Sequence, residues 1–100
     1  MSESNDWLFV DNTDDKRFEL HVDGQIARVE YIPAVGKIVL SHTEVPQELE
    51  GRGLAKYLVG KVLDHLATQD VEVIPLCPYV ISFIRKNPEY RRIVQPGYPV

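Results

Sequence analysis

Two glycines separated by one residue, Gly51 and Gly53, stand where an apolar stretch gives way to a long amphipathic one. Glycine has no Cβ, so it lets the backbone turn tightly and approach a ligand closely. The free N–H groups of a helix that opens here, with the positive end of its dipole, favour an anion such as phosphate. Arg52 could add a charge-assisted contact. The alternative is a loop whose glycines serve only the turn itself.

Three further residues carry side chains suited to chemistry. Cys77 is the only cysteine, and the proline after it predicts a helix N-cap, where the dipole favours a thiolate. Such a thiolate could act as a nucleophile in a two-step transfer, although a free cysteine often only fills space in a core. His42 and Glu44 could each take a proton, directly or through water. His42 could instead be a packed histidine, because it shares a strand face with Ile38 and Leu40.

The hydrophobic pattern shows which elements must position these residues. Apolar residues alternate with polar ones over 16–22, 25–32 and 37–45, which predicts three antiparallel strands, the first two joined by a hairpin turn at Asp23-Gly24. Residues 51–68 have the apolar stripe of an amphipathic helix packed on a sheet. A strand at 71–76 and a second helix at 77–86 follow, with Pro78 at the first helical position. A strand, helix and strand in this order predict a right-handed crossover, with parallel strands.

These elements predict a mixed α+β fold of about four mainly antiparallel strands and two helices, in the order β-β-β-α-β-α. One hundred residues are enough for one domain, which we expect at 16–94. Residues 1–15 form an N-terminal segment, with a short edge strand expected at 7–10. Residues 91–100 are expected to be irregular, and 95–100 form the C-terminal tail outside the domain. Because the core of such a short chain is small, we expect the protein to be a monomer or a weak homodimer.

Composition excludes several classes of protein. With 44% apolar and 26% charged residues, the chain is typical of a globular protein, and no apolar run is long enough to cross a membrane. The first residues lack the basic and then apolar pattern of a secretion signal, and one cysteine forms no internal disulfide, so we expect a cytoplasmic location. No Cys/His cluster has metal-ligand spacing, so no metal site is expected.

Charge is unevenly distributed along the chain. Residues 1–50 carry eleven Asp and Glu against four Lys and Arg, a balance of −7, whereas residues 51–100 carry four against seven, a balance of +3. The net charge of −4 argues against a nucleic-acid binder. The basic second half suits an anionic ligand, and the acidic first half suits a cationic one, although solvated faces would look similar.

The order of these elements around a Glu-x-x-Gly-x-Gly loop resembles the acetyl-CoA-binding core of GNAT-type N-acetyltransferases. The family pattern, Gln/Arg-x-x-Gly-x-Gly/Ala, is met from Glu48 to Gly53, with Glu48 at a position where Gln or Arg is usual. The short chain and three further segments resemble the small single-domain branch of this family. Those segments are His42-Thr43-Glu44-Val45, Ile74-Pro75-Leu76-Cys77-Pro78-Tyr79 and Asn87-Pro88-Glu89-Tyr90.

The resemblance covers about residues 17–94 and implies acetyl-CoA or coenzyme A as cofactor and a short GNAT-like fold. It implies that the loop backbone cradles the pyrophosphate, and that the strand end at Thr43 and Val45 pairs with the pantetheine arm. The loop residues concerned are Leu49, Glu50, Gly51, Arg52, Gly53, Leu54 and Ala55. It also places the thioester near Cys77 and near the strand end that carries His42 and Glu44, and it gives Glu44 the role of base.

Three functions follow as hypotheses. The first is an acetyl-CoA-dependent N-acetyltransferase that acts on an amine, either a small molecule or a protein lysine. The second is a module that binds coenzyme A or acetyl-CoA without catalysing transfer. The third is a thiol-based sensor or interaction domain in which Cys77 responds to oxidation and the glycine loop is only structural.

Overall fold

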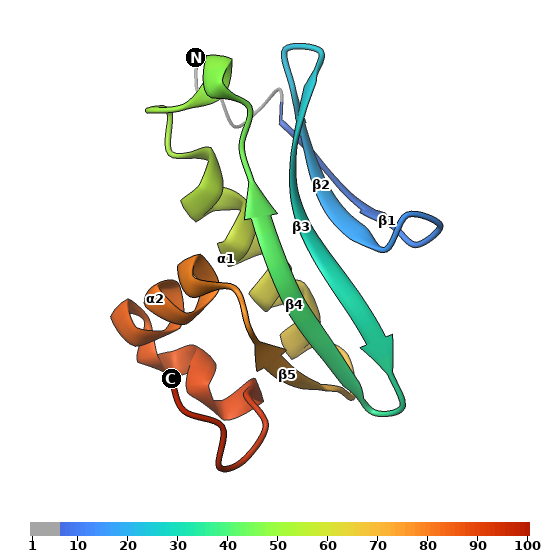
Figure 1. Cartoon of the computed structure of the whole chain (residues 1–100), viewed down its shortest axis with the longest axis vertical. Helices are drawn as coiled ribbons and strands as arrows, with labels where there is room; N and C mark the ends of the chain where they lie inside the picture. The colour runs from blue at the N-terminus through green and yellow to red at the C-terminus, as the bar shows by residue number, and fades with distance from the viewer. Residues whose placement is uncertain (1–6) are drawn as a thin grey trace.

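The computed structural model describes residues 7–100, which form one five-stranded sheet packed against two α-helices (Figure 1). The strands are β1 (Leu8–Asn12), β2 (Arg17–Val22), β3 (Gln25–Ala34), β4 (Lys37–Glu44) and β5 (Glu72–Pro75). The helices are α1 (Leu54–Ala67) and α2 (Pro78–Lys86). Two short 3-10 helices, η2 (Gln47–Leu49) and η3 (Pro88–Ile93), precede α1 and follow α2. The mixed α+β fold class is therefore confirmed.

The strands lie in the sheet in their sequence order, from β1 at one edge to β5 at the other. Neighbours from β1 to β4 are antiparallel, and β5 is parallel to β4, as the crossover through α1 predicts. The edge strand expected near residues 7–10 is present as β1, so the sheet has five strands rather than about four. The hairpin turn between β2 and β3 is also confirmed. Asp23 and Gly24 both have positive φ, 52° and 76°, as a tight two-residue turn requires.

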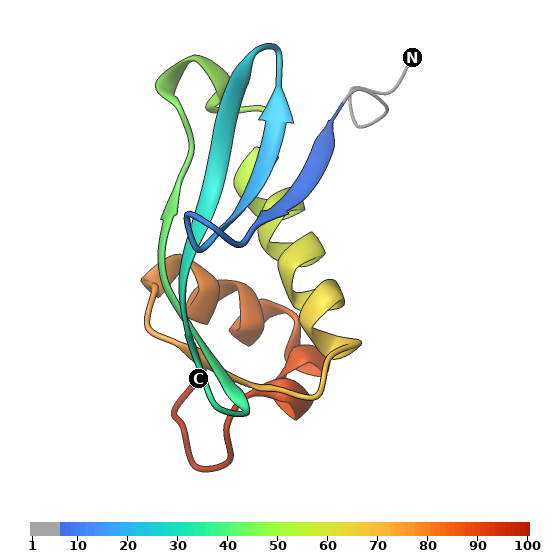
Figure 2. The same ribbon diagram turned by 90° about the vertical axis from the view of Figure 1, so that its right-hand side faces the viewer.

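Both helices lie on the same side of the sheet (Figure 2). The apolar row of α1 is fully buried at Leu58, Val59, Val62 and Leu63, and the core it joins contains the inward residues of every strand from β2 to β5. Helix α2 contributes two buried residues to the same core, Val80 and Ile84. Among the described residues no helix covers the opposite face of the sheet, so polar and charged side chains alternate outward there.

A β-bulge interrupts the pairing of β3 with β4. Glu30 pairs with His42 while the next residue, Tyr31, pairs with Leu40, so Ser41 is an extra residue on β4. The Ser41 hydroxyl donates a hydrogen bond to the backbone oxygen of Glu30, 3.2 Å away. Because side chains alternate along a strand, one extra residue reverses which face the following residues occupy.

Strands β4 and β5 separate after a short parallel ladder. Their pairing ends at Leu40 and Pro75, and the Leu40 carbonyl accepts hydrogen bonds from the N–H groups of both Leu76 and Cys77, each at 3.0 Å. Beyond this point β4 continues to Glu44, whereas the chain after β5 turns away into α2 (Figure 1). The result is a wedge between the two strands.

Three boundaries differ from the sequence expectation. Helix α1 begins at Leu54 rather than Gly51, because Gly53 has φ +76° and cannot be part of a right-handed helix. The expected strand at 71–76 is shorter, at residues 72–75. Part of the tail expected to be irregular is ordered, since η3 runs to Ile93 and Val94 forms a parallel bridge with Val73.

Candidate functional site

The segment between β4 and α1 is an anchored loop with two left-handed glycines. Leu49, in η2, is buried in the core and fixes the start of the loop. Gly51 and Gly53 then have φ values of +84° and +76°, which residues with a Cβ rarely adopt. A Cβ built on either glycine would meet no protein atom within 4 Å, so both glycines border open space.

The opening of α1 leaves hydrogen-bond donors available beside this loop. The N-cap residue is Gly53, which has no side chain to accept a hydrogen bond from the first helical turn. The first backbone hydrogen bond of the helix runs from the N–H of Tyr57 to the Gly53 carbonyl. The N–H groups of the three residues between them have no intrahelical acceptor, and they point along the helix axis with the positive end of its dipole.

A cavity of about 330 Å³ lies at this helix start and gathers most of the residues predicted to bind the cofactor. Seven of these line it: Val45, Leu49, Glu50, Gly51, Gly53, Leu54 and Ala55. Lys56 and Tyr79 complete the lining, and both were missed from the sequence. Helical spacing could have indicated Lys56, which lies one turn after Gly53. No sequence signal indicates Tyr79, which α2 brings to the loop from a distance in the chain.

Two of the predicted cofactor-binding residues do not line this cavity. The Arg52 guanidinium donates a hydrogen bond to Asp23 Oδ2 at 2.8 Å and so ties the glycine loop to the turn between β2 and β3. Thr43 lies in the wedge between β4 and β5, where its hydroxyl oxygen accepts a hydrogen bond from the Cys77 thiol at 3.3 Å. Arg52 thus holds the loop in place from outside.

Cys77 is the N-cap residue of α2, as its position before Pro78 predicts. The residue is only 4% exposed and is part of the hydrophobic core. The hydrogen bond to Thr43 joins the two sides of the wedge through side chains. The thiol therefore lies at the apex of the wedge, away from solvent, and it does not line the 330 Å³ cavity.

His42 and Glu44 lie together on the uncovered face of the sheet. The alternative of a packed His42 is wrong, because the bulge at Ser41 turns this residue outward and leaves its side chain 51% exposed. His42 Nε2 is 3.0 Å from Glu44 Oε1, and Arg28 approaches the same oxygen at 3.5 Å. The hydrogen bond from His42 and the charge of Arg28 lower the pKa of Glu44 below its ordinary value.

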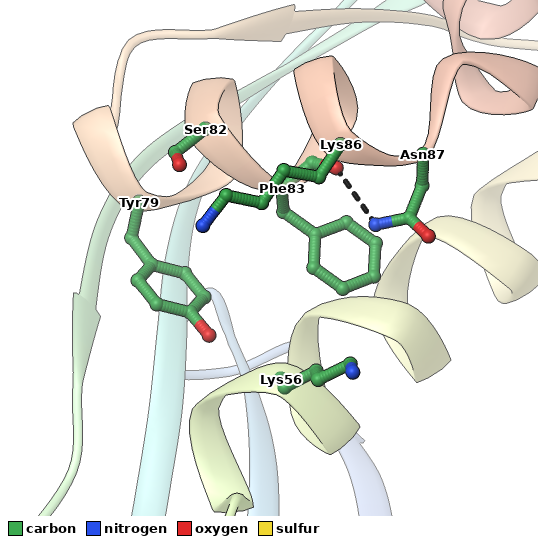
Figure 3. Close-up of a pocket in the computed structure, with 6 residues that line it drawn as sticks. All are labelled: Lys56, Tyr79, Ser82, Phe83, Lys86 and Asn87. Carbon is green, nitrogen blue, oxygen red and sulfur yellow. Dashed lines mark hydrogen bonds between the residues drawn. The ribbon is translucent and has the colours of Figure 1, made fainter.

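A second cavity, of about 280 Å³, adjoins the first between α1 and α2 (Figure 3). It shares Lys56 and Tyr79 with the first cavity and is otherwise lined by residues of α2 and its C-cap: Ser82, Phe83, Lys86 and Asn87. The Phe83 ring points from α2 toward α1, and the Asn87 amide donates a hydrogen bond to the Phe83 carbonyl at 2.9 Å. Burial raises the pKa of the Tyr79 phenol, so this group stays protonated at neutral pH.

Neither a metal cluster nor a spanning helix is found in residues 7–100. No group of three or more His, Cys, Asp or Glu side chains in this part of the chain could hold a metal ion. No helix among these residues is long and apolar enough to cross a membrane.

Comparison with known proteins adds independent information. A family model described as GCN5-related N-acetyl-transferase matches residues 17–93. Protein NATD1 from Bos taurus is 39% identical over 66 residues, which are 62% of this chain and 58% of that protein. Protein NATD1 from Gallus gallus is 38% identical over 66 residues, 62% of this chain and 60% of the relative. The chain thus spans about three fifths of the length of these curated relatives.

Proposed function

The chain belongs to the GCN5-related N-acetyltransferase family, and on that premise we propose that it transfers an acetyl group from acetyl-CoA to an amine. The observation that carries this proposal is the cavity at the start of α1, where seven residues proposed for cofactor binding meet Lys56. These residues suit a pyrophosphate. Unsatisfied backbone N–H groups, a helix dipole and a lysine all favour an anion, and the missing Cβ atoms of Gly51 and Gly53 leave room for it.

In this proposal, different segments of the chain bind different parts of the cofactor. The first turn of α1 and Lys56 bind the pyrophosphate. Thr43 at the end of β4 and Val45 just after the strand lie past the pairing of β4 with β5. In our proposal the backbone of this stretch pairs with the pantetheine arm as another strand would. Coenzyme A supplies the acetyl group as a thioester, whose carbonyl carbon an amine can attack.

We assign the proton transfer to His42, assisted by Glu44. The attacking amine forms a C–N bond, the C–S bond of the thioester breaks, the CoA thiolate leaves, and the proton of the amine must be taken up. Glu44 accepts a hydrogen bond from Nε2 of His42, which leaves Nδ1 as the nitrogen able to take that proton. The half-exposed position of His42 allows an acceptor to approach from the uncovered face of the sheet.

A two-step route through Cys77 is the alternative chemistry. In that route the thiol of Cys77 loses its proton and attacks the thioester, its sulfur gains the acetyl group, and CoA leaves as a thiol. The amine then takes the acetyl group and regenerates Cys77. The burial of this side chain favours the direct route, and it also disfavours a thiol sensor, which needs an accessible sulfur.

One observation favours the second candidate function, a binding module without transfer. None of His42, Glu44 and Cys77 lines the cavity that holds the cofactor-binding residues. A protein of this kind would bind acetyl-CoA through the same loop and release no CoA when an amine is added.

Release of CoA thiol, followed with a chromogenic disulfide, tests the proposal. Acetyl-CoA is incubated with the protein and, in parallel, with a polyamine, a lysine-containing peptide or a small primary amine. We expect CoA release that requires both the protein and an amine, with cationic amines preferred because the first half of the chain has a balance of −7. If acetyl-CoA binds but no CoA is released with any of these amines, the transferase proposal is wrong and the protein is a binding module.

A further inference from the structure

The uncovered face of the sheet carries a row of β-branched apolar side chains that lies outside the core. Ile32 on β3 pairs with Val39 on β4, and Val39 pairs in turn with Ile74 on β5. Leu40 and Val73, the neighbours of the latter two, are buried on the helix side, so alternation turns the row to the opposite face. Ile32 is 55% exposed. The row therefore presents apolar surface to solvent across three neighbouring strands (Figure 1).

This apolar row lies beside the residue to which we assign proton transfer. Glu30, two residues before Ile32 on β3, pairs with His42 on β4. Because side chains alternate along a strand, Glu30 and Ile32 emerge on the same face, roughly 7 Å apart. The extra residue Ser41 brings His42 to this face as well. A ligand that reaches His42 therefore has the apolar row within the length of two extended residues.

The charged groups around His42 suit a cation. The side chains of Glu30 and Glu44 are 41% and 53% exposed, and Arg28 is shared between them, at 2.8 Å and 3.5 Å. Two carboxylates against one guanidinium leave a local balance of −1 while His42 is neutral, as a base must be. The ammonium group of an approaching lysine is thus attracted to this place before it gives up its proton.

A polypeptide uses both the charged groups and the apolar row, whereas a small amine uses only the charged groups. A small primary amine reaches His42 and leaves the row in water. An extended polypeptide presents every second side chain to the same side, and these side chains are roughly 7 Å apart. The interval matches the separation of Glu30 and Ile32 on β3. When a lysine of such a chain reaches His42, its second neighbour therefore meets the row, whose β-branched side chains pack well against an extended chain.

We propose that the acceptor is a polypeptide lysine, and that the row of Ile32, Val39 and Ile74 binds an apolar residue two positions before or after that lysine. The inference rests on the proposed acetyl transfer and names its substrate. The row selects the acceptor, and His42 takes the proton of the selected amine. Because the row acts only through binding, its contact should lower KM for the peptide without changing kcat.

Pairs of lysine peptides test this selection in the CoA-release assay. In the first pair, the residue two positions after the lysine is leucine or serine, and in the second pair the residue two positions before the lysine is exchanged in the same way. We expect leucine to raise kcat/KM about tenfold in one of these pairs, because an apolar side chain leaves water. A third pair exchanges the residue next to the lysine, which points away from the sheet, and should show no preference. Equal kcat/KM for leucine and serine in both of the first two pairs would overturn the proposal.

Two substitutions in the protein remove the same contact. Ile32→Thr and Val39→Thr keep a β-branched side chain in the strand and replace apolar atoms by a hydroxyl, so each should remove most of the preference for leucine over serine. Val35→Thr is the matched control, because Val35 is 99% exposed and lies in the turn between β3 and β4, outside the row. Far-ultraviolet circular dichroism of each variant checks that the fold is retained. If Val35→Thr removes the preference as fully as Val39→Thr does, the row is not the binding surface.

The outcomes separate this inference from the proposed function. If small amines are acetylated but peptides with leucine and with serine react equally, only this inference fails. If neither an amine nor a peptide releases CoA, the proposed transfer fails and this inference fails with it. Sedimentation velocity of the natural chain and of Val39→Asp should show monomers for both. A dimer of the natural chain that Val39→Asp dissociates would assign the row to a second copy of this chain and overturn the proposal.

Discussion

At the scale of single residues, the proposed proton transfer depends on the His42–Glu44 pair. The hydrogen bond from His42 and the charge of Arg28 lower the pKa of Glu44, so its carboxylate stays ionised across the neutral range. An ionised Glu44 fixes the orientation of the imidazole and stabilises it once it has gained a proton. This arrangement supports the proposed roles of His42 as base and Glu44 as its orienting group.

His42→Ala should lower kcat for acetyl transfer by roughly 100-fold, the lower end of the range for loss of a general base. Acetyl-CoA affinity should not change, because His42 is on the opposite face of the sheet from the helices and the cavity at α1. His21→Ala is the matched control, since His21 on β2 also contacts a carboxylate, that of Glu19 on the same strand, at 2.8 Å. Equal rates in the two variants would refute the assignment.

Cys77→Ala should retain both acetyl-CoA binding and transfer if the direct route is correct. It should cost about 1 kcal/mol of unfolding free energy, because a buried sulfur is lost from the core. Thermal unfolding and the CoA-release assay measure the two effects. Loss of transfer in this variant, with an acetylated Cys77 detected by mass spectrometry of the natural chain, would instead establish the two-step route.

Residue types and spacing indicated the glycines and the N-cap position of Cys77, but not the whole site. Gly51 and Gly53 have a local signature, because their backbone conformation depends on the residues themselves. Tyr79 has none, because only the packing of α2 against α1 brings it to the loop. The Arg52–Asp23 ion pair could not be found either, since it depends on the hairpin turn lying beside the loop.

At the scale of elements, the proposed cofactor binding depends most on the segment between β4 and α1. Leu49 anchors it in the core, Arg52 ties it to a neighbouring turn, and two glycines give it a conformation that leaves the helix N–H groups uncovered. These restraints fix the loop before any ligand arrives, so the proposed anion site should lose little ordering entropy on binding.

Gly53→Ala should lower the unfolding free energy by about 1 to 2 kcal/mol, the cost of a left-handed conformation for an L-residue. It should also weaken acetyl-CoA binding, because the new methyl group enters the cavity. Gly36→Ala is the control, since Gly36 has φ +71°, borders open space and lies in the turn between β3 and β4. Urea unfolding should show similar losses in both variants, and titration should show weaker binding only in Gly53→Ala. Equal affinities would contradict the loop assignment.

Element types were predictable from periodicity, but two local features were not. Strict alternation along β4 placed His42 inward with Leu40, whereas the extra residue Ser41 reverses the faces. A bulge leaves no mark in the pattern of apolar residues, so alternation alone cannot reveal it. The predicted start of α1, at Gly51, was three residues too early for a related reason. The apolar stripe indicates the helix, but it does not reveal the left-handed glycine that precedes it.

At the scale of the whole molecule, one face of the sheet is covered by helices and the other by a network of charges. On that outer face Glu19 is the buried member, and it accepts hydrogen bonds from Arg17 at 2.6 Å, Asn12 at 2.9 Å and His21 at 2.8 Å. Burial alone would raise the pKa of Glu19, but these donors outweigh it and lower the pKa to about 2. The network thus stabilises the folded chain only while Glu19 is ionised.

The free energy of unfolding should therefore fall in acid. Since the pKa of Glu19 is depressed from the usual 4.5 to about 2 on folding, its contribution is complete above about pH 5 and is lost as the pH falls toward 2. The full loss is about 3 kcal/mol, from 1.36 kcal/mol for each pKa unit. Urea unfolding from pH 7 to pH 2.5 measures it.

Glu19→Gln should be less stable at pH 7 and less sensitive to acid than the natural chain. Glu30→Gln is the control, because Glu30 contacts Arg28 at 2.8 Å but its side chain is 41% exposed, so its ion pair contributes little. If Glu19→Gln and the natural chain lose stability equally between pH 5 and pH 2.5, Glu19 is not the acid-sensitive group.

The overall architecture was largely predictable, because length, periodicity and the crossover rule leave few arrangements. The order of strands, the parallel pairing of β4 with β5 and the two helices all follow from these rules. The ordered η3 was not predictable, because it is held by contacts with α1 and α2 rather than by its own sequence. The cavities lined by Lys56 were not predictable either, since their walls combine residues of α1 with residues of α2 that are distant in the sequence.

The most direct test of the central claim is calorimetric titration of the purified chain with acetyl-CoA, beside the Lys56→Glu variant. Lys56 lines both cavities described above, so reversing its charge should abolish binding to the pyrophosphate without disturbing the core. We expect one molecule of acetyl-CoA to bind each natural chain with micromolar affinity, and no measurable binding by the variant. Absence of binding to the natural chain, or equal binding to both, would contradict the claim that the Gly51–Gly53 loop is a pyrophosphate site.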